Sequence, residues 1–124
     1  KNKSFRTNLG FVEEADAQYY LNAADILLIP RKDELNSGNI TLGFTFGLVV
    51  LGRAGGDIGE ILKETGNPVF NPSNESSVTH ATLKALDLSA ENHGESNQIL
   101  SLKEWRLEQV SEMYYKFYTK LRNI

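Results

Sequence analysis

Runs of apolar residues alternate with stretches of helical periodicity along the 124-residue chain. From Glu13 onward the apolar positions recur at the spacing that lines one face of a helix: Ala17, Tyr20, Leu21 and Ala24. After Asp25, residues 26–29 are all apolar, as in strands that are buried on both faces of a parallel sheet. Pro30 ends this predicted strand, because proline has no N–H group for the hydrogen bonds of a sheet.

Residues 39–46 allow two interpretations. Apolar side chains alternate there with threonine or glycine: Ile40, Leu42, Phe44 and Phe46. This period favours a strand, and with it a β-hairpin that closes at Gly47. Residues 48–51, however, form another short apolar run, and two parallel strands need a crossover between them, usually a helix. A helix of about two turns over residues 39–46 would supply that crossover, so the pattern alone leaves both interpretations open.

The next part of the chain predicts two helices separated by a strand. Asp57 and Glu60 have the spacing of a capping box, for a helix that ends near Gly66. Residues 69–70 form a third short strand, and Asn74 caps the helix that follows. The expected inner face of that helix is Val78, Thr82, Ala85 and Leu86.

The last predicted helix has the clearest signals. It follows a polar loop over residues 89–96, and Ser101 and Glu104 form a second capping box. Leu100 and Trp105 sit where a hydrophobic staple would join the two sides of that cap. Its apolar residues form a stripe: Leu107, Val110, Tyr114, Phe117 and Leu121.

The order of these elements predicts the fold class. Alternating helices and short apolar strands indicate one α/β domain over residues 1–124, with a Rossmann-like parallel sheet flanked by helices. Ligands of such sheets bind at the carboxyl ends of the strands. Those ends are residues 30–37, 52–57 and 71–73.

Composition narrows the function classes. The net charge is −3, whereas a broad nucleic-acid-binding face needs a basic excess. The chain has no cysteine, which excludes disulfides and thiolate metal sites and fits a reducing compartment, so we expect a cytoplasmic protein. No apolar run approaches the roughly 20 residues that span a bilayer, which leaves peripheral contact with the inner membrane face open. Because the sequence starts at Lys1 without an initiator Met, we expect a piece of a longer protein.

The main candidate site is the segment Asn36, Ser37, Gly38 and Asn39, which follows the first clear strand. If it opens a helix, the free N–H groups of the first turn favour a bound anion such as a diphosphate. Gly38 would let the ligand approach the backbone, and Ser37 and Asn39 would add side-chain donors. The alternative is that Asn36 or Ser37 is simply a helix cap.

Two neighbouring segments are weaker candidates. Lys32, Asp33 and Glu34 are candidates for the donor-sugar side of the site, unless the loop is only a solvated charged segment. A cation there could also pair with phosphate oxygens, and a carboxylate could accept hydrogen bonds from sugar hydroxyls. The glycine-rich residues 52–56 resemble a phosphate loop loosely, but a tight strand-to-helix turn is the favoured explanation. His80 and His93 have no partner at ligand spacing, so we expect no metal and no cofactor.

Several of these segments resemble the group 1 (GT4-like) glycosyltransferases of the GT-B fold. The similar segments, in order, are residues 8–12 (NLGFV), 23–30 (AADILLIP), 36–50 (NSGNITLGFTFGLVV), 56–60 (GDIGE), 69–72 (VFNP) and the final helix at 105–121. Each is weakly specific alone, but together they cover almost the whole chain in the right order.

The resemblance implies the C-terminal, nucleotide-sugar-binding part of such an enzyme. In the family the segment after the Ser-Gly pair is a helix, which favours the helical interpretation of residues 39–46. The implied reaction transfers a sugar from a nucleotide-diphosphate sugar to a glycan or lipid-linked acceptor, as in polysaccharide biosynthesis. An N-terminal acceptor domain is expected in the full protein, so this chain alone is expected to be inactive.

The chain departs from the common pattern of that family. Glu34 occupies the position of the first of two glutamates eight positions apart, but Leu42 stands at the second, where the family contacts the ribose. Lys32 and Asp33 instead match the basic-acidic pair of the branch with Ser-Gly. Two other hypotheses remain: a non-catalytic α/β interaction or receiver-like module, and a GT-B-like nucleotide-sugar epimerase.

Overall fold

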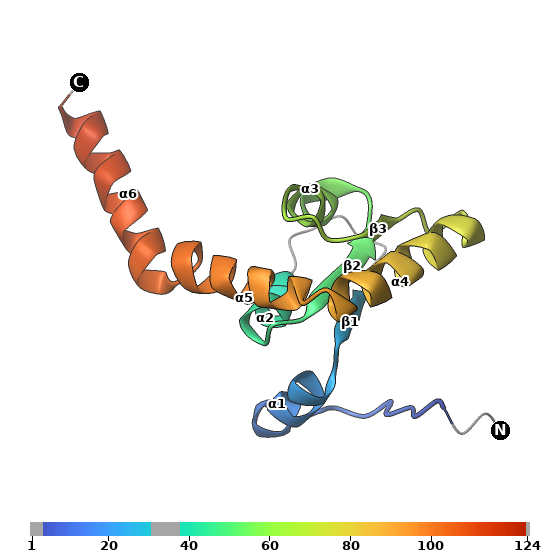
Figure 1. Cartoon of the computed structure of the whole chain (residues 1–124). Coiled ribbons are helices and arrows are strands. Elements are labelled where there is room, and N and C mark those ends of the chain that lie inside the picture. The colour runs from blue at the N-terminus through green and yellow to red at the C-terminus, as the bar shows by residue number, and fades with distance from the viewer. Residues whose placement is uncertain (1–3, 31–37, 124) are drawn as a thin grey trace.

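The computed structural model describes residues 4–30 and 38–123 of the chain. Helices and strands alternate along it, and three helices follow the last strand (Figure 1). The elements are α1 (Glu14–Ala23), β1 (Ile26–Ile29), α2 (Gly38–Thr45), β2 (Val49–Arg53), α3 (Gly56–Glu64), β3 (Val69–Phe70), α4 (Glu75–Ala90), α5 (His93–Glu104) and α6 (Leu107–Arg122). The predicted α/β class is confirmed, with one helix more than the sequence pattern indicated.

Within the described residues, the strands form a small open parallel sheet in the order β1-β2-β3. β1 pairs with β2 from Ile26 opposite Val49 to Ile29 opposite Gly52, and β2 pairs with β3 through Gly52 and Arg53. The arrangement is compatible with a Rossmann-like fold. Because α2 is a helix and β1 and β2 run parallel, the β-hairpin interpretation of residues 39–46 is wrong.

Helices cover both faces of the sheet. On one face, α2 and α3 cover a core of buried residues: Ile29, Ile40, Phe44, Val50, Ile58 and Leu62. Leu100 of α5 and Trp105, which follows α5, pack against this core. On the other face α4 closes a second core: Val49, Leu51, Phe70, Ala81 and Ala85. Successive residues of β2 point to opposite faces, so the strand is buried throughout, as predicted.

The edge strand β1 differs from the prediction. Leu28 shares its face with Leu51, on the side that α4 covers, and yet its side chain is 52% exposed. α1 is helical as predicted, but none of its residues is buried. Residues 8–12, one of the segments similar to the glycosyltransferase family, belong to no strand, and both Leu9 and Phe11 are exposed.

The region between α4 and α6 also corrects the sequence prediction. Residues 89–96 are not a loop, because α4 continues to Ala90 and α5 begins at His93 after a tight turn at Asn92. Ser101 does not cap a helix: it lies buried inside α5, where its hydroxyl is 3.2 Å from that of Thr45. The predicted cap at Asn74 is confirmed, since its side chain accepts a hydrogen bond from the Ser77 N–H group at 3.2 Å.

A buried pair of amide side chains fastens α5 to the sheet. Asn67 and Asn97 donate to each other's side-chain oxygen, both at 2.9 Å. Asn67 also accepts from the N–H group of Val50 at 3.1 Å, and Asn97 donates to the carbonyl of Leu48 at 2.9 Å. β3 pairs only with Gly52 and Arg53 and is too short to reach the start of β2. The two amide side chains therefore supply the hydrogen bonds that backbone groups near the start of β2 would otherwise lack.

Candidate functional site

The carboxyl ends of the strands lie at one edge of the sheet, because the strands are parallel. The first turns of α2 and α3 therefore lie at that same edge, beginning at Gly38 and Gly56. Helix N-termini expose N–H groups without partners in the helix and carry the positive end of the helix dipole. This edge is where the topology favours an anionic ligand.

Two of the seven predicted site residues are described by the structure. Gly38 and Asn39 form the exposed start of α2, as the phosphate-site hypothesis requires. A Cβ atom built on Gly38 would have no atom of the described residues within 4 Å, so the described part of the chain does not cover the backbone there. The predicted diphosphate ligands Asn36 and Ser37, and the predicted sugar ligands Lys32, Asp33 and Glu34, lie outside the described residues.

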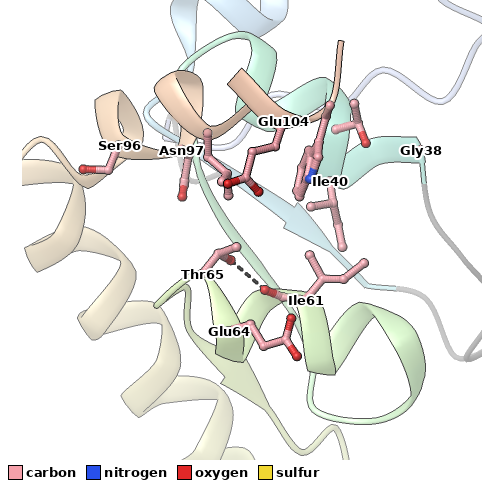
Figure 2. A pocket seen from close by; sticks show the side chains of 11 residues that line it. Gly38, Ile40, Ile61, Glu64, Thr65, Ser96, Asn97 and Glu104 are labelled. Atoms are coloured by element: carbon pink, nitrogen blue, oxygen red, sulfur yellow. Dashed lines mark hydrogen bonds between the residues drawn. The ribbon is translucent and has the colours of Figure 1, made fainter. Parts of the chain in front are cut away.

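A cleft of about 860 Å³ extends from Gly38 between α2, α3 and α5 (Figure 2). Thr41 lines it from α2, Glu64 and Thr65 from the end of α3, and Ser96 and Glu104 from α5. Asn97 and four residues with apolar side chains complete the lining; the four are Ile40, Ile61, Leu100 and Trp105. The indole of Trp105 stacks on Phe44 with ring centroids 5.1 Å apart and the planes 8° from parallel, which fixes this wall.

The polar groups of the cleft are acidic or neutral. Glu64 and Glu104 stand on opposite walls, and Figure 2 shows both among the side chains around the opening. No lysine or arginine is among the described residues that line it. Carboxylates accept hydrogen bonds from hydroxyl groups but repel phosphate, so an anion is favoured only at the Gly38 end.

The sequence analysis did not single out these cleft residues as a site. Thr41, Glu64 and Glu104 come from three helices, and they line one cleft only because α2 and α5 pack together next to α3. Trp105 was visible as the one tryptophan of the chain, but it was assigned to a helix cap. A contact between helices that are far apart in sequence leaves no local pattern.

The second glycine-rich turn has a packing explanation. A Cβ atom on Gly52 would lie 2.8 Å from a methyl group of Leu62, which is fully buried. Gly56 has a φ angle of 62°, in the left-handed region that glycine adopts without strain. Residues 52–56 therefore form the tight strand-to-helix turn that the sequence analysis offered as the alternative to a phosphate loop.

Among the described residues, no group of three histidine or acidic side chains gathers where it could hold a metal ion. His93 is engaged in the packing of α5, with its Nε2 atom 2.9 Å from the carbonyl of Thr65. In the same part of the chain, no helix is both long and apolar enough to cross a bilayer.

Comparison with models of protein families, with curated proteins and with solved structures finds no match to this chain. Its fold and its cleft are therefore the basis for any functional assignment.

Proposed function

We propose that the chain is the donor-binding part of a GT-B glycosyltransferase of the group 1 type, which transfers a sugar from a nucleotide-diphosphate sugar to a glycan or lipid-linked acceptor. The observation that carries the proposal is the start of α2 at Gly38, which lies at the carboxyl edge of a parallel sheet and is not covered by the other described residues. The resemblance of residues 23–30 and 36–50 to that family supports it.

In this proposal the N–H groups at the start of α2 bind the diphosphate. The diphosphate gains negative charge as the bond to the sugar breaks, so oriented N–H groups and the helix dipole stabilise the transition state more than the ground state. Asn36, Ser37 and Asn39 would add donors. Lys32 would pair with a phosphate oxygen, and Asp33 or Glu34 would hold the sugar hydroxyls.

Isothermal titration calorimetry of the chain with a panel of nucleotide-diphosphate sugars tests this placement. Gly38→Asp puts a carboxylate beside the proposed diphosphate, and we expect it to weaken binding by about tenfold or more. The matched control is Ser76→Asp, which adds the same charge to the exposed first turn of α4. Equal affinities for the two variants, or no binding by the parent chain, would contradict the proposal.

A further inference from the structure

The last helix presents an apolar surface that the rest of the described chain does not cover. α6 contacts α5 at its start and then runs away from the sheet toward the C-terminal end (Figure 1). None of its residues is buried. Its apolar residues define what we call the α6 stripe: Leu107, Val110, Met113, Tyr114, Phe117 and Leu121.

The α6 stripe is continuous along the helix. At about 100° of rotation per residue, its six side chains fall within an arc of about 120°. Leu107 is 78% exposed and Leu121 is 48% exposed, so the surface is accessible at both ends. Val110, Met113, Tyr114 and Phe117 line one shallow hollow on it. A helix with this pattern needs an apolar partner.

The charges of α6 indicate which partner fits. From Tyr114 to Arg122 the helix carries Lys116, Lys120 and Arg122 and no acidic residue. At about 100° per residue, Lys120 and Arg122 flank the stripe on opposite sides. Glu108 and Glu112 lie on the opposite, polar face, where Glu112 is paired with Lys116 at 2.8 Å. Cations therefore border the apolar surface, and acidic groups face away from it.

We propose that the α6 stripe lies in the surface of an anionic membrane, with the helix axis parallel to the bilayer. The aromatic and aliphatic side chains would enter the boundary between headgroups and acyl chains, and Lys120 and Arg122 would contact anionic headgroups. Charged side chains, among them the Glu112–Lys116 pair, occupy the opposite face of α6, so the helix would lie on the surface rather than cross the bilayer.

A second copy of the chain fits the α6 stripe less well. The spacing of three and four residues allows a paired helix. Tyr114 would occupy a central position of that seam, and Lys120 would border it without an acidic residue on the same half of the helix. A lipid surface has no such requirement for matched side chains.

Co-sedimentation of the whole chain with lipid vesicles tests the proposal. We expect binding to phosphatidylcholine vesicles that contain about one third phosphatidylglycerol, and much weaker binding to pure phosphatidylcholine. Phe117→Glu should lower the partition coefficient by about tenfold or more. Lys120→Gln should lower it about fivefold, and added salt should weaken binding by the parent chain.

The matched control is Thr119→Glu, which adds the same charge on the opposite side of α6 and should leave binding within about twofold of the parent. Helicity from circular dichroism and the fluorescence of Trp105 verify that each variant is folded. The proposal is overturned if the parent chain stays in solution with anionic vesicles, or if Phe117→Glu binds them equally well. A dimer in light scattering that Phe117→Glu dissociates, without vesicle binding, would assign the stripe to a second copy. Because the assay contains no nucleotide sugar, it is independent of the proposed donor site.

Discussion

Helices α5 and α6 are neighbours in the chain, but the polar helix packs against the sheet domain and the amphipathic helix does not. α5 (His93–Glu104) is polar and only weakly amphipathic, and yet Gly94, Asn97 and Ser101 are buried. α6 (Leu107–Arg122) has the most regular apolar stripe of the second half of the chain, and it buries no residue. The amount of apolar surface on a helix therefore did not determine which of the two joins the body of the protein.

The difference lies in specific short-range contacts. At the end of α2, Gln98 of α5 donates to the carbonyl of Thr45 at 3.0 Å, and Gly94 lies against the backbone of Gly47 in the turn that follows. The amide pair of Asn67 and Asn97 then completes the hydrogen bonds of β2. For α6, the described residues provide no surface that would bury its stripe. Close packing and satisfied polar groups fix α5, whereas α6 is available for a partner.

The largest expected effect is at the contact between Gly94 and Gly47. In Gly94→Ala the added methyl group would overlap the carbonyl oxygen of Gly47, and backbone on both sides leaves it no space. We expect a loss of about 3 kcal/mol in the free energy of unfolding, measured by urea denaturation. Gly38→Ala is the control, because its methyl group meets no atom and should change stability by less than about 0.5 kcal/mol. Similar values for the two variants would show that α5 does not approach α2 this closely.

The next effect concerns the buried amide pair. Asn97→Ala removes the donor to the carbonyl of Leu48 and both hydrogen bonds with the side chain of Asn67, and we expect a loss of about 2 kcal/mol. A double-mutant cycle with Asn67→Ala should give a coupling energy of about 1 kcal/mol or more, since the two side chains share their hydrogen bonds. Gln98→Ala, which removes an exposed hydrogen bond, is the control and should cost about 0.5 kcal/mol. Additive effects of the two asparagine variants would contradict the reciprocal pairing.

Sequence patterns predicted the central sheet better than its surroundings. The three apolar runs became β1, β2 and β3, because a buried parallel strand requires a continuous apolar segment. Alternation in residues 39–46 pointed toward a strand, and only the need for a crossover and the family resemblance favoured the helix that is present. The start of α5 was missed because residues 93–96 are polar and were assigned to a loop, with the helix beginning only at Ser101. Asn97 and Ser101 hold α5 in place through partners about 30 to 56 residues away, which no local pattern shows.

The candidate site was predictable in part. Its place at the carboxyl edge of the sheet follows from the order of the elements, and Gly38 was identified as the start of a helix. The cleft walls were not, because Thr41, Glu64 and Glu104 are ordinary surface residues until α2, α3 and α5 pack. The Ser101–Glu104 capping box failed because the Ser101 hydroxyl contacts Thr45 within the packed helix pair.

A smaller effect is expected in the stripe of α6. Phe117→Ala should change the free energy of unfolding by less than about 0.5 kcal/mol, although a buried phenylalanine typically contributes about 3–5 kcal/mol. The reason is that Phe117 is already exposed in the folded chain and loses little contact. Thermal denaturation of the chain without lipid measures this. A drop of several degrees would indicate that the stripe packs on part of the chain in solution.

The smallest effect is expected for the ion pair on the polar face of α6. The side chain of Lys116 donates a hydrogen bond to Glu112 and attracts its charge, which holds the pKa of Glu112 below its usual value of 4.5. A lowered pKa in the folded state stabilises the fold above the unfolded pKa, and this contribution is lost as the pH falls through the folded pKa. Both side chains are exposed, so water and salt screen the pair, and Glu112→Gln should leave the melting temperature at neutral pH unchanged within error. A different outcome would be that Glu112→Gln lowers the melting temperature near pH 7 but not near pH 3, and that high salt does not remove the difference. That outcome would mean that the ion pair is shielded from solvent, and that α6 packs against more of the protein than its contact with α5.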